Sequence, residues 1–229
     1  MNRWRAGLTR VEVWFIAGGL AFLMLAAALL PALARSRAEG RRANCAKNLE
    51  MIGRALAAYR NDNGDYFPFS QGPACSVPNG LNNAAASSLG TLYRKYLTTA
   101  HPFRCPATED RPGFASYGEG AYRTWALLGS SYGYDPRISQ QARRNVVTMA
   151  DMDGTYRFGG DTATYNHAGG QNVLYADGHV QWVEDNFASE NPNDNIFAQD
   201  PWDADTDTYL VRGDLNNLTV SFDGYDHLK

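Results

Sequence analysis

The sequence predicts an α+β protein in which one long N-terminal helix packs against a small antiparallel β-sheet head. An uncharged apolar run covers residues 13–34, and an amphipathic segment continues the same helix. Farther along, short stretches rich in β-branched and aromatic residues predict strands, and two of them flank the turn dipeptide Asp177-Gly178. With 229 residues, the chain is long enough for one such domain and a stem.

The apolar run predicts a membrane-spanning helix. It reads "VWFIAGGLAFLMLAAALLPALA" and contains no charged residue over residues 13–34. At about 1.5 Å per residue it spans a hydrocarbon core of about 30 Å. It is longer than the core of a signal peptide, and no clear small-residue cleavage site follows it. We therefore expect a single-pass membrane anchor.

The helix is expected to run from about residue 8 to residue 61, with an apolar half (8–34) and an amphipathic half (35–61). Apolar residues at steps of four and three line one face of the second half: Cys45, Leu49, Ile52, Leu56 and Tyr59. Polar residues and a glycine at 61–64 then end the helix. The amphipathic face is expected to pack on the head, residues 62–229.

Charge is divided unequally along the chain. Residues 1–60 carry 10 Lys and Arg against 3 Asp and Glu, whereas residues 61–229 carry 11 against 21. An acidic head lacks the positive surface that nucleic-acid binding requires, so nucleic acid is not an expected partner.

The residues before and inside the apolar run, "AGLTRVEVWFIAGGLAFL", combine a short basic segment, a glycine and a lone acid, Glu12, at the border of the run. A carboxylate at that depth needs a charged partner. This pattern resembles the N-terminus of type IV prepilins and type II secretion pseudopilins. The resemblance implies that a prepilin peptidase removes residues 1–7 by cutting between Gly7 and Leu8. It also implies that Leu8 is methylated, and that Glu12 neutralises the N-terminal amine of a neighbouring subunit. Leu8 and Arg10 depart from the phenylalanine and the apolar residue that are usual in that family.

The resemblance further implies a structural subunit of a pseudopilus or pilus-like filament, with no enzymatic activity and no required cofactor. Its partners would be other copies of the chain, related pilin-like subunits, the prepilin peptidase, the assembly machinery and the bacterial inner membrane. The arginines that follow the apolar run would keep the head in the cytoplasm by the positive-inside rule alone. The resemblance instead places the head in the periplasm, and in an envelope or surface filament after assembly.

A β-hairpin is predicted over residues 172–183, where "NVLYA" and "HVQWV" flank Asp177-Gly178. A type I′ turn at this dipeptide pairs Tyr175 with Val180. The apolar face expected to pack on the stem helix then consists of Val173, Tyr175, Val180 and Trp182. Elsewhere in the head, residues 87–97 predict a short helix and residues 101–113 a loop. Two further stretches, 123–135 and 145–151, predict strands.

His167 stands before this hairpin, separated by nine residues from Asp177-Gly178. An extended strand over 172–176 spans about 16 Å, so His167 and Asp177 lie at opposite ends of the hairpin and are not expected to form a dyad. His167 is expected to bond backbone groups of the glycine loop. The spacing also resembles the C-terminal signature of a large group of prepilin-like proteins. Those chains carry a cysteine before an "NL" in the stem, a "CP" pair and an "SYG" strand, all present here.

The three cysteines fit neither a disulfide-rich scaffold nor a CxxC zinc site. Cys75 and Cys105 lie in loop-like stretches and can pair if the head occupies an oxidising compartment. That pairing leaves Cys45 as a small packed residue.

The acidic segment 185–217 offers a candidate calcium site. Asp203, Asp205 and Asp207 alternate, as they do in calcium-binding loops. Thr208 occupies the position where an EF-hand requires glycine, so an EF-hand is not expected. A calcium loop and a solvated acidic loop remain the two alternatives, and the major pseudopilins are known for a calcium site in a C-terminal loop.

Two other functions remain open. One is a non-polymerising, membrane-anchored binding or adhesin domain, in which Glu12 would be dispensable. The other is a tethered metal-dependent hydrolase that uses His167, Asp151, Asp153 or His179, although no G-x-S-x-G, HExxH or other catalytic motif accompanies these residues.

Overall fold

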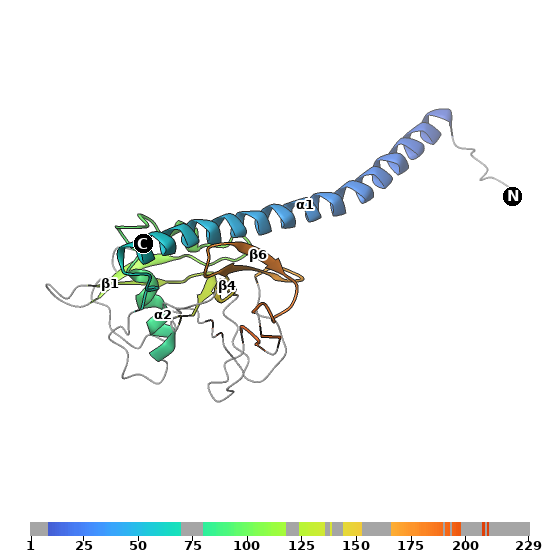
Figure 1. Ribbon diagram of the computed structural model, residues 1–229. Coiled ribbons are helices and arrows are strands. Elements are labelled where there is room, and N and C mark those ends of the chain that lie inside the picture. The colour runs from blue at the N-terminus through green and yellow to red at the C-terminus, as the bar shows by residue number, and fades with distance from the viewer. Residues whose placement is uncertain are drawn as a thin grey trace. The chain divides into compact units, whose positions relative to one another are not determined.

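The computed structural model describes residues 9–69, 80–117, 124–135, 138, 144–152, 166–189, 191–192, 194–197, 208 and 210. These residues form the helices α1 (Arg10–Asp62) and α2 (Gly80–Gly90) and the short 3₁₀ helix η1 (His101–Phe103) (Figure 1). The strands are β1 (Gly113–Tyr117), β2 (Thr124–Leu128), β3 (Tyr132–Tyr134), β4 (Val147–Asp151), β5 (Gln171–Tyr175) and β6 (Val180–Val183). The predicted α+β class, with one long helix and small antiparallel sheets, is confirmed.

Helix α1 begins with a reciprocal cap. The Thr9 backbone N–H donates to Glu12 Oε2 at 2.7 Å, and the Glu12 N–H donates to Thr9 Oγ1 at 3.3 Å. These bonds satisfy backbone donors that a helix start otherwise leaves without partners. At the other end, Gly64 and Asp65 adopt φ values of 64° and 66°. The Asp65 N–H donates to the Arg60 carbonyl at 2.8 Å, and the left-handed residues end the helix as predicted.

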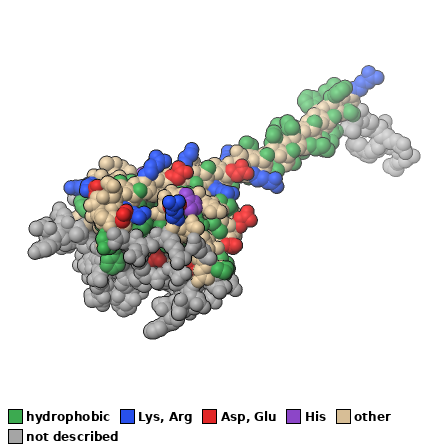
Figure 2. All heavy atoms as spheres, in the orientation of Figure 1, with side chains coloured by type: hydrophobic (Ala, Val, Ile, Leu, Met, Phe, Trp, Pro, Cys, Tyr) green, Lys and Arg blue, Asp and Glu red, His purple; other side chains and the backbone are tan. Residues whose placement is uncertain are grey.

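The first part of α1 exposes its apolar side chains. One 18-residue window of the helix has a mean hydropathy of 2.4, and none of its residues is buried. The helix is therefore long and apolar enough to cross a membrane. Figure 2 shows hydrophobic side chains along this part and charged ones along the later part. The exposed large side chains are Val11, Val13, Trp14, Phe15, Ile16, Leu20, Phe22, Leu23, Met24, Leu25, Leu29, Leu30 and Leu33.

The later part of α1 contributes one face to the core of the head. Cys45, Leu49, Ile52 and Leu56 are buried there and Tyr59 is partly buried, which confirms the predicted apolar series. Gly53 lies on the same face, and a Cβ atom at this position would come 3.0 Å from Leu174 Cδ1 of β5. The helix therefore packs closely on the sheet at Gly53.

The strands form two antiparallel sheets, β1-β2 and β3-β4-β5-β6. In the larger sheet, Met149 of β4 and Leu174 of β5 belong to the core that includes α1. Val147 and Val173 belong to a second buried cluster, together with Ile196 and other residues of the C-terminal segment. Every residue of β5 is buried because both faces of the sheet are covered. The described part of the C-terminal segment thus includes core residues as well as solvated ones.

The hairpin β5-β6 forms, but its register differs from the prediction by one residue. Leu174, rather than Tyr175, pairs with Val180. The Gly178 N–H donates to the Tyr175 carbonyl at 2.9 Å, and within the turn only Gly178 has positive φ (91°). The loop is therefore a three-residue turn whose last residue forms a bulge, in place of the predicted type I′ turn. Because a shift of one residue exchanges the faces of a strand, Leu174 faces α1 and Tyr175 faces the second cluster.

The region between α1 and the hairpin shows two further differences. Helix α2 lies at Gly80–Gly90 rather than at 87–97. It ends where its backbone meets β2, since a Cβ atom at Gly90 would lie 1.9 Å from the Trp125 carbonyl oxygen. Strand β1 was not predicted, because its sequence "GFASY" lacks β-branched residues and its formation depends on pairing with β2.

Candidate functional site

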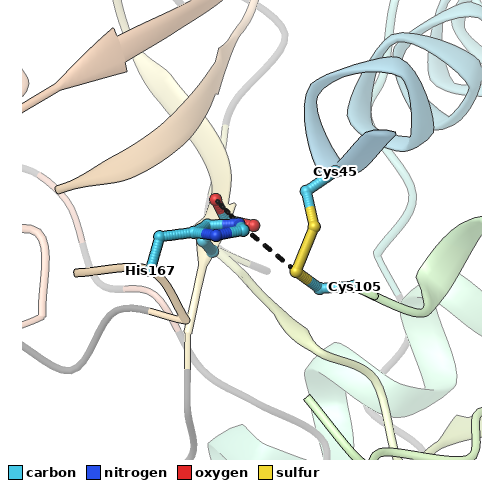
Figure 3. A group of neighbouring side chains, drawn as sticks. Cys45, Cys105 and His167 are labelled. Carbon is cyan, nitrogen blue, oxygen red and sulfur yellow. Dashed lines mark hydrogen bonds and ion pairs between the residues drawn. A yellow bond between two sulfur atoms is a disulfide. The ribbon is translucent and has the colours of Figure 1, made fainter. Parts of the chain in front are cut away.

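A buried disulfide joins the stem helix to the head. Cys45 of α1 is bonded to Cys105, which lies two residues beyond η1, and the two Cα atoms are 5.1 Å apart (Figure 3). Both residues have no exposed surface. The predicted pairing of Cys75 with Cys105 is therefore wrong, and Cys75 itself lies outside the described residues. The signal for the true partner was Cys45's place at the start of the buried helical series.

His167 lies beside this disulfide. Its backbone forms an isolated bridge with Gly170, at the entry to β5. Its ring, however, lies against Cys105 and Asp151, whereas the sequence predicted a bond to the glycine loop. Nε2 lies 3.3 Å from Cys105 Sγ and 3.5 Å from Asp151 Oδ2, and the side chain is only 7% exposed. The edge of the ring also contacts Trp182.

Asp151 ends β4 and has no exposed surface. Its Oδ2 accepts hydrogen bonds from the backbone N–H and the side-chain Nδ2 of Asn172, both at 2.8 Å. Its Oδ1 has no hydrogen-bond partner among the residues that the structure describes. Burial raises the pKa of the Asp151 carboxyl group to about 7, and the bonds from Asn172 only partly oppose that rise.

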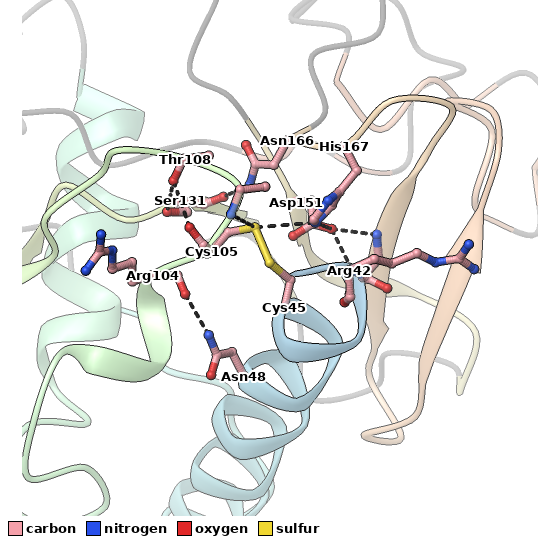
Figure 4. The surroundings of a disulfide bond; sticks show 12 residues. Arg42, Cys45, Asn48, Arg104, Cys105, Thr108, Ser131, Asp151, Asn166 and His167 are labelled. Atoms are coloured by element: carbon pink, nitrogen blue, oxygen red, sulfur yellow. Dashed lines mark hydrogen bonds and ion pairs between the residues drawn. A yellow bond between two sulfur atoms is a disulfide. The ribbon is translucent and has the colours of Figure 1, made fainter. Parts of the chain in front are cut away.

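The electrostatics keep His167 neutral. Burial is the main cause that lowers its pKa to about 4, and the nearby charges of Arg42 and Arg41 lower it further. Figure 4 shows Arg42 near Asp151 and His167. The Arg42 guanidinium stacks 3.5 Å above the centroid of the Trp182 ring, and the Arg42 carbonyl accepts a bond from Asn172 Nδ2. A neutral imidazole, a carboxyl group and two sulfur atoms therefore share one buried site.

The disulfide cluster, Cys45, Cys105, Asp151 and His167, contains side chains of the types that bind metal ions. One ligand atom from each of Cys45, Cys105, Asp151 and His167 lies within 4.8 Å of the others. Of the four residues that the hydrolase alternative offers, the structure brings His167 and Asp151 into contact. It does not add His179, which lies at the hairpin tip, and Asp153 is outside the described residues. With both cysteines in a disulfide, the site holds α1 covalently to the loop after η1, and His167 and Asp151 lie beside that bond.

Asp177 and Gly178 have a structural role at the other end of the hairpin. Asp177 Oδ1 accepts a hydrogen bond from the His179 backbone N–H at 3.1 Å and also contacts His179 Nδ1. Arg60 of α1 donates to the Ala176 carbonyl at 3.0 Å. His167 and Asp177 thus have separate partners, in agreement with the expectation that they form no dyad. The pocket beside this tip holds about 40 Å³, far below the volume of a usual small-molecule site.

The remaining predicted residues fall into two groups. Glu12 is described, and within a single chain its partner is Thr9, through the cap at the start of α1. The sequence signal for that cap, Thr9-x-x-Glu12, was missed. Gly7, Leu8 and the three aspartates of the candidate calcium loop, Asp203, Asp205 and Asp207, lie outside the described residues, so their roles stay predictions. No protein-family model, curated protein or solved structure matches this chain.

Proposed function

We propose that the protein is a membrane-anchored, pilin-like structural subunit of a pseudopilus or pilus-like filament. The observation that carries the proposal is the continuity of α1. One 53-residue helix joins an exposed apolar part to a buried face that a disulfide fixes to the head. So many exposed apolar side chains need lipid or the helices of other subunits around them. A single helix can exchange the first environment for the second without refolding the head.

The disulfide supports a head outside the cytoplasm. Disulfides persist in oxidising compartments such as the bacterial periplasm and are rare in the cytosol. Cys45 and Cys105 therefore favour a periplasmic head, against the arginines that follow the apolar run. This support is independent of the resemblance of residues 6–23 to prepilins.

Processing is tested by the intact mass of the protein from cells with and without prepilin peptidase. Loss of residues 1–7 and gain of one methyl group, only when the peptidase is present, is the expected result. The same unprocessed N-terminus in both strains would contradict the proposal.

Assembly is tested with two matched variants that separate the charge of Glu12 from its capping bond. Glu12→Gln removes the charge, while glutamine at this position still supports a capping box. Thr9→Ala removes the side-chain half of the cap and keeps the charge. If Glu12 pairs with the amine of a neighbouring subunit, Glu12→Gln abolishes filaments and Thr9→Ala preserves them, with equal membrane levels of both proteins.

The Thr9–Glu12 cap also favours a second function, because it gives Glu12 a role inside one chain. In a non-polymerising, membrane-anchored binding domain, Glu12 serves the helix start alone. Glu12→Gln is then silent, and cross-linking in the membrane yields only monomers for every variant. This outcome would contradict the filament subunit and support the anchored binding domain.

A further inference from the structure

The disulfide cluster contains potential metal-ligand groups in addition to the two bonded cysteines. Besides the two cysteine sulfurs, His167 Nε2 and an oxygen of Asp151 point into the same space, and all four ligand atoms lie within 4.8 Å of one another. They come from four separate segments: α1, the loop after η1, β4 and the entry to β5 (Figure 4). A disulfide alone would be satisfied by apolar neighbours.

The donor set matches what zinc selects. Zinc takes thiolate, imidazole and carboxylate ligands in a tetrahedron, with sulfur at about 2.3 Å and nitrogen at about 2.0–2.1 Å, so the ligand atoms lie about 3–4 Å apart. His167 Nε2 already lies 3.3 Å from Cys105 Sγ and 3.5 Å from Asp151 Oδ2. The nitrogen–sulfur and nitrogen–oxygen distances therefore already fall in the range that a tetrahedral zinc site requires.

Burial and charge favour a cation in the same space. Cys45, Cys105 and Asp151 have no exposed surface, and Asp151 Oδ1 has no hydrogen-bond partner among the described residues. After reduction, the buried thiols and the Asp151 carboxyl group can ionise together only if a cation balances up to three negative charges there. A divalent metal removes most of that charge.

We propose that reduction of the Cys45–Cys105 disulfide converts this cluster into a zinc site whose ligands are Cys45, Cys105, His167 and Asp151. A dithiol reductant supplies two electrons and two protons, the S–S bond breaks into two thiols, and the reductant becomes a disulfide. Zinc then displaces one proton from each thiol, and the proton of the Asp151 carboxyl group where present, into solvent. Neutral His167 supplies the Nε2 lone pair and keeps its proton on Nδ1.

The disulfide and the metal exclude each other, because each uses both sulfur atoms. The consequence is that α1 and the loop after η1 stay linked in a reducing as well as in an oxidising environment, and the metal adds β4 and the entry to β5 to that link. This inference does not depend on filament assembly, since it concerns residues of the head and the adjoining turn of α1 only.

The test uses the full chain in detergent, with Co²⁺ as a spectroscopic probe and Zn²⁺ as competitor. After reduction, the chain is expected to bind one Co²⁺ with the d–d bands of tetrahedral cobalt and a thiolate charge-transfer band, and Zn²⁺ should displace it. The disulfide-bonded chain should show neither band. Cys75→Ser is the matched control and keeps both bands, whereas Cys105→Ser loses them.

Two further variants test the other ligands without disturbing the disulfide. His167→Gln and Asp151→Asn should form the Cys45–Cys105 bond when oxidised, which verifies their folding. When reduced, each should bind zinc at least about tenfold more weakly than Cys75→Ser. Absence of the charge-transfer band from the reduced parent chain would overturn the proposal, whether that chain stays folded or unfolds. So would unchanged spectra and affinities in both ligand variants.

Discussion

Asp151 and His167 hold one proton between them in the folded, disulfide-bonded chain. Between about pH 4 and pH 7, the raised pKa of Asp151, about 7, keeps its carboxyl protonated, and the lowered pKa of His167, about 4, keeps its imidazole neutral. In the unfolded chain, Asp151 ionises above about pH 4 and His167 stays protonated below about pH 6.5. Between these values both states bind one proton, so the pair contributes almost no pH dependence to the free energy of unfolding.

Single substitutions should reveal the opposing contributions of Asp151 and His167 to the pH dependence of the free energy of unfolding. In His167→Gln, the folded chain keeps the Asp151 proton between about pH 4 and 7, whereas the unfolded chain loses it. The free energy of unfolding should therefore fall as pH rises from about 4 to 7. In Asp151→Asn, the unfolded chain binds a proton at His167 between about pH 6.5 and 4, whereas the folded chain does not. The free energy of unfolding should therefore fall as pH falls from about 6.5 to 4. Each slope should reach about 1.4 kcal/mol per pH unit relative to the parent chain. Urea unfolding at several pH values, in the presence of a chelator, measures both slopes. Parallel curves for the two variants would show that the groups are not coupled to folding.

Removal of the disulfide should destabilise the head strongly. Cys45 and Cys105 are 60 residues apart, and closing a loop of that length restricts the unfolded chain by about 4 kcal/mol in free energy. The double substitution Cys45→Ala with Cys105→Ala should lower the free energy of unfolding by about that amount in oxidising buffer. Cys75→Ala is the control and should change it by less than about 1 kcal/mol. Equal effects of the two proteins in urea titrations would contradict the observed pairing.

Among the secondary-structure elements, the β5-β6 hairpin illustrates what sequence patterns leave open. Asp177-Gly178 correctly located the turn, but a type I′ turn and a three-residue loop with a bulge both place glycine at positive φ. The choice between them shifts the register by one residue and exchanges the strand's faces. Since β5 is buried on both faces, its sequence lacks the alternation that would have indicated the register.

The contact between α2 and β2 yields a prediction with a matched control. A Cβ atom at Gly90 would meet the Trp125 carbonyl, so Gly90→Ala should force the two elements apart and cost about 1–3 kcal/mol. At Gly40, inside α1, a Cβ atom meets nothing within 4 Å, and Gly40→Ala should be neutral or stabilising by up to about 1 kcal/mol. Thermal unfolding of both variants tests this difference. A stable Gly90→Ala protein would show that the α2–β2 contact is looser than described.

For the entire chain, the boundary near Gly40 predicts an independent head. Residues from Arg41 onward form one compact unit that includes both sulfurs of the disulfide and lacks the exposed apolar part of α1. A chain starting at Arg41 and exported to an oxidising compartment should be soluble without detergent and contain no free thiol at Cys45 or Cys105. The full chain should need detergent. Size-exclusion chromatography and thiol titration test both statements, and aggregation of the shortened chain would contradict them.

Local patterns alone determined the long helix, its exposed apolar part, its buried face, its end near residue 62 and the position of the hairpin turn. Each depends on residues close together in the sequence, where helical periodicity and the backbone preferences of glycine act directly. Tertiary structure decided the partner of Cys105, the faces of β5, the limits of α2 and the meeting of His167 with Asp151. These outcomes join segments up to 130 residues apart, from Arg42 of α1 to Asn172 of β5, and depend on which surfaces are buried together. A single sequence does not encode that information in any local pattern.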